Sequence, residues 1–169
     1  ERRFVKVRDD GRVLITGSHI YAGKEDRRKR YSNAIGVDAI DGEGVDVCLD
    51  LEGDVSSLGK FDHIECISVL EHSRRPWNLA KNLVRLLRTD GTIYISAPFV
   101  WRYHGYPHDY WRFSAQGIEE LFAPDIRWSK ICYASNGLRS DSFLKGLQDD
   151  DNYPHLPRCE VVGFGTRRS

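Results

Sequence analysis

The stretch from Trp101 to Phe113 carries side chains suited to proton transfer and to ring binding. A histidine accepts protons near neutral pH, and a neighbouring carboxylate can orient its ring. His104 is therefore a candidate base toward a hydroxyl group, with Asp109 as the residue that orients it. Aromatic and basic side chains of the same stretch are candidate substrate contacts, with Tyr110 or Trp111 stacking on a ring. These contacts are Tyr103, Tyr110, Trp111 and Arg112.

The same stretch also fits a structural role as a packed lid. Asp109 and Arg112 stand three residues apart, a spacing at which their charges can pair locally. Pro107 would stiffen the turn, and the aromatic side chains would cover a site beneath them. No metal site is expected, because His104, His108 and Asp109 could share an ion only if the loop curled. The catalytic and the lid interpretation both stay open.

A second candidate base, His72, follows Glu71 at the end of the apolar stretch from His63 to Leu70. Its imidazole could also accept a proton near neutral pH. We favour a structural interpretation for this pair, in which Glu71 and His72 begin a helix and brace a loop.

The ends of three apolar, strand-like runs carry residues suited to a nucleotide-like ligand. Gly17 ends the first run, where a glycine lets the backbone turn tightly and approach a ligand. Asp38 follows about 20 residues later, where such folds bind ribose, because a carboxylate accepts two hydrogen bonds from a vicinal diol. Asp41 is a nearby competitor. Asp50 and Leu51 end the third run and suit an exocyclic amine and an adenine face, respectively.

These residues stand between alternating strand-like and helix-like segments. Strands are expected at residues 12–16, 33–39, 45–49, 63–69, 92–97, 126–134 and 159–164, and helices at 76–88, 114–122 and 140–148. The alternation favours one mostly parallel sheet. The last two strands alternate in polarity, which suits a sheet edge and an antiparallel final strand. Since ligands bind outside the carboxyl ends of parallel strands, we expect the candidate residues along one edge.

Local signals mark the boundaries of two of these helices. The helix expected at 76–88 begins at Pro76, and Gly91, just after Asp90, is expected to prevent it from continuing. Ser114 is expected to cap the next helix, with Gly117 at its third helical position.

The bulk composition indicates one domain without a dominant charge. The chain has 169 residues, and its 25 basic and 25 acidic residues cancel, which gives no indication of nucleic-acid binding. No apolar stretch approaches the roughly 20 residues of a membrane helix and no signal peptide opens the chain, so a cytoplasmic protein is expected. The chain begins at Glu1 without any methionine, so its N-terminus is expected to extend further. The four cysteines lack CxxC spacing and are expected to be reduced, buried thiols.

Two motifs, FDHIECISVLEH and RLLRTDGTIYISAP, together with the spaced Asp38 and Asp50, resemble the class I S-adenosylmethionine-dependent methyltransferases of the methyltransferase type 11 kind. The resemblance covers nearly the whole chain. It implies a three-layer, Rossmann-like α/β fold with a mostly parallel seven-stranded sheet and an antiparallel last strand. It also implies S-adenosylmethionine as cofactor, with Asp38 at the ribose and Asp50 at the adenine. The implied cofactor contacts are Thr16, Gly17, Ser18, Asp38, Asp50, Leu51, Ser68, Val69 and Leu70.

The pattern HxxPxDYxRF, from His104 to Phe113, resembles a subgroup of these enzymes found in surface-polysaccharide and other glycan biosynthesis. The leading hypothesis is therefore methyl transfer to an oxygen of a small or glycan-linked acceptor. The first loop departs from the family, because Thr16-Gly17-Ser18-His19 replaces an acidic residue and several glycines. A non-catalytic binding or scaffold protein is the rival hypothesis. A nicotinamide-dependent enzyme is a weaker third, since no pyrophosphate-binding loop is present.

Overall fold

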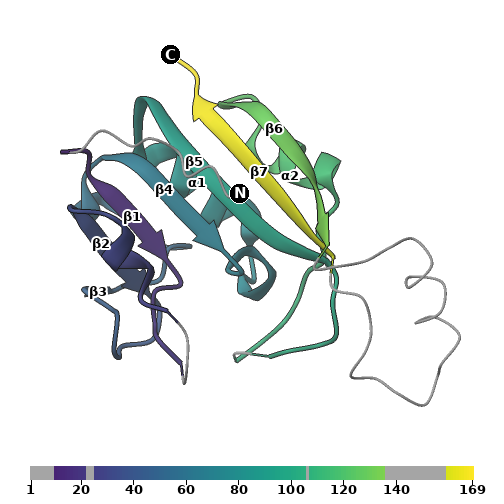
Figure 1. Ribbon diagram of the computed structural model, residues 1–169, viewed down its shortest axis with the longest axis horizontal. Coiled ribbons are helices and arrows are strands. Elements are labelled where there is room, and N and C mark those ends of the chain that lie inside the picture. The colour runs from purple at the N-terminus through teal and green to yellow at the C-terminus, as the bar shows by residue number, and fades with distance from the viewer. Residues whose placement is uncertain (1–9, 22–24, 106, 136–158) are drawn as a thin grey trace, which may run out of the picture.

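One seven-stranded sheet organises the computed structural model, which describes residues 10–21, 25–105, 107–135 and 159–169. The strand order is β3-β2-β1-β4-β5-β7-β6 (Figure 1). The first five strands along the chain pair in parallel, and β7 is antiparallel to both β5 and β6. The predicted mostly parallel sheet with an antiparallel last strand is therefore confirmed. The strands are β1 (Val13–Thr16), β2 (Ala34–Asp38), β3 (Val47–Cys48), β4 (Phe61–Ile67), β5 (Leu87–Val100), β6 (Ile126–Ser135) and β7 (Cys159–Arg167).

The strand order reverses direction between the central strands β1 and β4. From β1 the chain adds β2 and β3 on one side, and it then returns to add β4 and β5 on the other. Such a reversal is the point at which open α/β sheets bind ligands, at the carboxyl ends of the strands. The loops that follow β1 and β4 leave the sheet there, and β5 carries the aromatic stretch toward the same end (Figure 1).

Two α-helices, α1 (Pro76–Leu86) and α2 (Ala115–Phe122), pack on one face of the sheet (Figure 1). Strand periodicity explains the core beneath them, because Ile64 and Cys66 of β4 point to this face and lie in the main apolar cluster. Helices α1 and α2 contribute to the same cluster through buried leucine, isoleucine and phenylalanine side chains. As predicted, Ser114 caps α2 by accepting a hydrogen bond from the Gly117 N–H.

The opposite face of β4 carries polar side chains. His63 and Glu65 point to this face and are buried. Tyr31, directly after the 3₁₀ helix η1 (Arg27–Arg30), donates a hydrogen bond to Glu65 and lies beside the His63 ring. Both described α-helices, α1 and α2, lie on the other face of the sheet. The predicted helix at 140–148 lies outside the described residues. A layer of helices on this second face therefore stays a prediction.

The boundary between α1 and β5 differs from the prediction. Helix α1 ends at Leu86, and β5 begins at Leu87, well before the expected Thr92. Leu87 is fully buried and pairs with Phe61 of β4, so its burial on the sheet outweighs a further helical turn. Gly91 lies within β5, directly after Asp90 with its φ of 60°, so the glycine does not mark the helix end.

Strand β7 and the cysteines correct two further expectations. β7 lies between β5 and β6, so of the last two strands only β6 lies at an edge of the sheet, and β3 forms the other edge. Of the four cysteines, which are all free thiols, Cys66 is buried, Cys48 is exposed, and Cys132 and Cys159 are intermediate. The other expected strands and helices of the described residues are present with shifts of one to three residues at their ends. No described helix combines the length and apolar character needed to cross a bilayer.

Acid pH should destabilise the protein through His63, whose burial lowers its pKa to about 4. Between pH 6.5, the ordinary pKa of histidine, and about pH 4, His63 is protonated in the unfolded chain and neutral in the folded chain. The free energy of unfolding therefore decreases as the pH falls from 6.5 toward 4. Replacing His63→Gln should remove about 2 kcal/mol of the loss in unfolding free energy between pH 7.5 and pH 5, as measured by urea titration. The exposed His108→Gln should leave the loss unchanged, and equal pH dependence of His63→Gln and wild type would contradict the assignment.

Candidate functional site

The loops after β1 and β4 meet at the carboxyl edge of the sheet. Gly17 has a φ of +59°, and a Cβ built on it would lie 2.6 Å from Val69 Cγ2, so only glycine fits there. Ser68, at the end of β4, also adopts the left-handed region with a φ of 53°, a conformation that is uncommon for a residue other than glycine. Leu70 is fully buried beneath them. The structure therefore brings the predicted residues of these two loops together.

Asp38 lies at the end of β2 and holds the first loop in place. Its carboxylate accepts hydrogen bonds from the His19 N–H at 3.1 Å and the Ile40 N–H at 3.0 Å. Each carboxylate oxygen can accept a further hydrogen bond, so the residue can still receive a ligand hydroxyl. Its competitor Asp41 is exposed. Asp38 thus couples the end of β2 to the loop that contains Gly17.

Asp50 and Leu51 separate in the structure. Asp50 is exposed and accepts a hydrogen bond from the Glu52 N–H at 2.8 Å. Leu51 is only 7% exposed, packs in the apolar core, and has its carbonyl bonded by the buried Asn82. The Leu51 side chain therefore belongs to the core, and its contact with an adenine face stays a prediction.

Beneath the first loop lies a buried ion pair that the sequence did not single out. Arg27 Nη2 donates to the carbonyls of Thr16 at 2.8 Å and Gly17 at 3.0 Å, and its Nη1 lies 3.8 Å from Glu65 Oε2. The Thr16 hydroxyl is buried and donates to the Glu65 carbonyl. The sequence signal that could have indicated this ion pair was Glu65, an acidic residue within the apolar run of β4. Among the described residues, Ser18 Oγ, His19 Nδ1 and Arg27 Nη1 are buried here without a hydrogen-bond partner.

Arg112 closes the aromatic stretch into a compact loop. Its guanidinium donates to both oxygens of Asp109, at 2.5 and 2.8 Å, and to the carbonyls of Trp101 and Arg102. These hydrogen bonds lower the pKa of Asp109 to about 2. Asp109 in turn accepts from the His104 N–H at 2.8 Å, and its Oδ2 lies 3.0 Å from His104 Nδ1. The local Asp109–Arg112 pair and the orienting of His104 by Asp109 are both present.

This loop docks on the end of β4 through its backbone. The N–H groups of Tyr110 and Trp111 both point to the carbonyl of Glu71, at 2.8 and 3.3 Å. The Trp111 indole N–H donates to the Ser73 carbonyl at 2.9 Å. Tyr103, by contrast, is 72% exposed. Of the predicted substrate contacts, Trp111 and Arg112 therefore hold the loop, and the rings of Tyr103, Tyr110 and Trp111 are all exposed.

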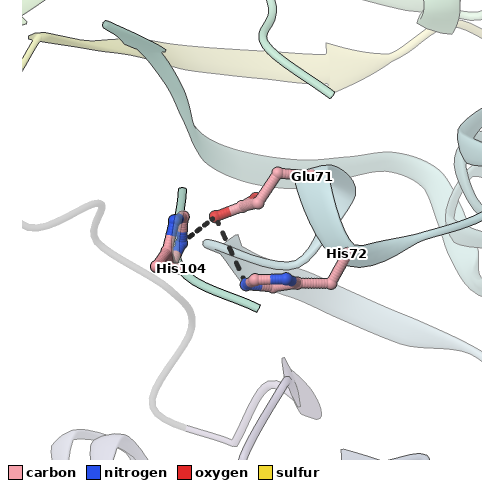
Figure 2. A group of neighbouring side chains, drawn as sticks. All are labelled: Glu71, His72 and His104. Carbon is pink, nitrogen blue, oxygen red and sulfur yellow. Dashed lines mark ion pairs between the residues drawn. The ribbon is translucent and has the colours of Figure 1, made fainter. Parts of the chain in front are cut away.

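Glu71, His72 and His104 converge where the loop meets the 3₁₀ helix η3 (Leu70–His72), as Figure 2 shows. Glu71 Oε1 lies 3.8 Å from the Nε2 atoms of both histidines. The Glu71 side chain is buried, neither of its oxygens has a hydrogen-bond partner in the described residues, and burial raises its pKa to about 8. His72 Nδ1 lies 2.6 Å from the His108 carbonyl, which agrees with a loop-bracing role.

His108, which was considered with His104 and Asp109, is not part of the group of possible ligands found among the described residues. His108 is exposed and its ring lies beside Tyr110, with 5.3 Å between centroids. Glu71 takes part in the observed cluster although it was not among the predicted site residues. The signal available for it was an acidic residue directly after a buried strand. Its meeting with His104, on a loop far along the chain, follows from the docking of that loop.

No family model and no curated protein sequence matches the chain. Solved structures do match it. The N-methyltransferase NodS of Bradyrhizobium japonicum WM9, in complex with S-adenosyl-L-homocysteine, has a TM-score of 0.62 and 11% identity, over 94% of this chain and 78% of NodS. The 1,6-didemethyltoxoflavin-N1-methyltransferase of Burkholderia thailandensis, with its substrate and S-adenosylhomocysteine, has a TM-score of 0.64 and 16% identity, over 94% and 72%.

A cyclase also shares the architecture. SpnF has a TM-score of 0.64 and 13% identity, over 94% of this chain and 75% of SpnF. At these identities the likeness concerns the fold. The chain thus has the Rossmann-like fold of S-adenosylmethionine-dependent methyltransferases.

Loosening the Arg112 contacts should release the loop from the sheet. Arg112→Lys keeps the charge and loses the planar fork that reaches Asp109 and the two loop carbonyls together. Hydrogen bonds to charged groups contribute about 1.5–3 kcal/mol each, so amide exchange at Tyr110 should accelerate by about 10-fold or more. Exchange measured by NMR should stay unchanged in β4, and the exposed Arg102→Lys should behave like wild type. Unchanged exchange at Tyr110 in Arg112→Lys would show that other contacts hold the loop.

Proposed function

We propose that the protein transfers a methyl group from S-adenosylmethionine to an oxygen of a small or glycan-linked acceptor. The observation that carries this proposal is the contact between the loops after β1 and β4, next to Asp38 at the end of β2. In this fold that edge is where a nucleotide-like ligand binds. Support also comes from the neighbours NodS and the toxoflavin methyltransferase, whose structures contain S-adenosylhomocysteine.

The first loop would hold the methionine part of the donor. Ser18 Oγ, His19 Nδ1 and Arg27 Nη1 are buried polar atoms without hydrogen-bond partners in the described residues, although Arg27 Nη1 lies 3.8 Å from Glu65. Buried polar groups are nearly always hydrogen-bonded in native proteins, so these atoms suit the charged carboxylate and ammonium groups of a bound amino acid. Thr16 would contribute through its backbone, since its hydroxyl is already bonded.

The other donor contacts follow the strand ends. Asp38 would accept hydrogen bonds from the ribose hydroxyls, and the exposed Asp50 would accept one from the adenine amine. Ser68 and Val69 would lie beneath the methyl group, with the buried Leu70 supporting them. Leu51, which is largely buried beside Asp50, would pack against the adenine face.

The loop from Trp101 to Phe113 would form the acceptor side. Methyl transfer requires an oxygen held in line with the C–S bond in a site that excludes water. Tyr103 and Tyr110 offer exposed aromatic rings to an acceptor, and Asp109 fixes the ring of His104. The acceptor hydroxyl must lose its proton, either to His104 directly or through a cation that acidifies it. The glycan assignment rests on the resemblance of the HxxPxDYxRF pattern.

A non-catalytic or differently reacting protein is the second candidate. Arg27 occupies the carbonyls of Thr16 and Gly17, in a loop without the usual glycines. SpnF, named as a cyclase, shows that the fold also occurs in proteins with another named activity. Donor binding without methyl transfer to any tested hydroxyl acceptor would favour this candidate.

Calorimetry with S-adenosylmethionine and S-adenosylhomocysteine tests donor binding. The wild-type chain should bind both, and Asp38→Ala should weaken binding by about 10- to 100-fold, because a hydrogen bond to a charged group contributes about 1.5–3 kcal/mol. Asp41→Ala is the matched control, since Asp41 is exposed three residues further on, and it should stay within about 2-fold.

Two outcomes of this experiment would contradict the proposal. The first is no binding of either ligand at millimolar concentration. The second is an unchanged affinity in Asp38→Ala. Circular dichroism of Asp38→Ala would establish that the variant is folded, because Asp38 also bonds the backbone of His19 and Ile40.

A further inference from the structure

We propose that Glu71, His72 and His104 bind a divalent metal ion of the zinc class, which holds and polarises the acceptor oxygen. The role at the acceptor rests on the proposed function, whereas the ion site itself rests on the geometry of the three side chains. Two imidazoles and one carboxylate, with a position left open, are a ligand set of catalytic zinc sites.

The distances suit a shared ion. The three potential ligand atoms all lie within 4.8 Å of one another, and Glu71 Oε1 is 3.8 Å from each Nε2. Ligands about 2.0–2.1 Å from a tetrahedral ion stand roughly 3.3 Å apart, so shifts of about half an ångström bring these atoms to it. The 3.8 Å separations are too long for hydrogen bonds between the histidines and Glu71.

Both histidines have their Nδ1 atoms engaged with oxygen acceptors. His72 Nδ1 lies 2.6 Å from the His108 carbonyl, and His104 Nδ1 lies 3.2 Å from the Arg102 carbonyl and 3.0 Å from Asp109 Oδ2. A carbonyl or carboxylate oxygen accepts a hydrogen bond, so Nδ1 carries the hydrogen in each ring. The lone pair of each neutral ring is then on Nε2, the atom that faces Glu71 (Figure 2). Metal-binding histidines are commonly oriented in this way.

The charge around Glu71 also favours a cation. Its carboxyl group is buried, and neither oxygen has a hydrogen-bond partner among the described residues. Asp109 and Glu160 act on it as negative charges, and Arg112 acts on it as a positive charge. An ionised carboxylate buried in this way costs free energy unless a counter-charge is present. A divalent ion would supply that charge and both missing partners.

An ion here would join the acceptor loop to the sheet. Glu71 and His72 come from η3 after β4, and His104 comes from the loop that follows β5. Three protein ligands leave an open position for a hydroxyl oxygen, whose pKa the ion lowers. The oxygen then forms a bond to the methyl carbon as the C–S bond breaks, sulfur keeps the electron pair, and the hydroxyl proton passes to solvent. In this arrangement His104 is a ligand and not the base.

Metal binding by the full chain tests the site directly. Chelator-treated protein is titrated with Zn²⁺ by competition calorimetry and with Co²⁺ by visible absorption, which reports the ligand geometry. Wild type should bind one ion per chain, and Glu71→Gln and His104→Gln should each weaken binding by about 100-fold. His108→Gln is the matched control, because its side chain is exposed on the same loop, and it should bind like wild type. All variants are checked for folding by circular dichroism.

The outcomes separate this proposal from the proposed function. Equal Zn²⁺ affinity in wild type, Glu71→Gln and His104→Gln would overturn the metal site and would show adventitious binding. Donor binding by the metal-free protein, measured beside it, does not depend on this site and tests the methyltransferase assignment alone. Methyl transfer that is undiminished in chelator, with S-adenosylmethionine bound, would return the role of base to His104 and overturn the metal's role.

Discussion

The parallel pairing of β1 with β4 is the constraint on which the rest of the site depends. The two strands pair in register from Val13 with His63 to Thr16 with Cys66, so both end at the same edge of the sheet. The loops that follow must therefore leave side by side, and Gly17 meets Val69 without room for a side chain. This contact shapes the edge of the sheet at which we propose that the methyl donor binds.

The buried carboxylates around this edge differ in how many hydrogen-bond partners they have. Glu65 accepts a hydrogen bond from Tyr31 and faces Arg27, and Asp109 is held by the fork of Arg112. Those groups stabilise the two loops, and their partners belong to the fold. Glu71 is buried and neither of its oxygens has a hydrogen-bond partner in the described residues, while the Nε2 atoms of His72 and His104 lie 3.8 Å from its Oε1. Since an unpaired buried carboxylate is costly and rare, its position between two histidines indicates a function beyond structure.

The sequence was informative where a signal is local. Apolar runs and period-two alternation predicted the strands, and Ser114 predicted the N-terminal cap of α2. Both signals depend only on neighbouring residues. The start of β5 at Leu87 was missed because it depends on the pairing of Leu87 with Phe61, a residue distant in sequence. The place of β7 inside the sheet depends in the same way on partners distant in sequence.

The candidate site was predictable only in part for the same reason. Asp38 follows from its position after a strand, and the Asp109–Arg112 pair follows from their spacing. The cluster around Glu71 could not be foreseen, because it requires the loop after β5 to dock through its own backbone on the Glu71 carbonyl. The burial of Leu51 could not be foreseen, since its place after a strand does not reveal that its side chain packs in the core.

Native mass spectrometry of the full chain is the most direct test of the central claim, that the edge between β1 and β4 binds the methyl donor. The protein is incubated with an equimolar mixture of S-adenosylhomocysteine and nicotinamide adenine dinucleotide, and the bound mass is read from the intact complex. The account predicts one S-adenosylhomocysteine per chain and no dinucleotide. A dinucleotide adduct, or no adduct of either compound, would contradict it.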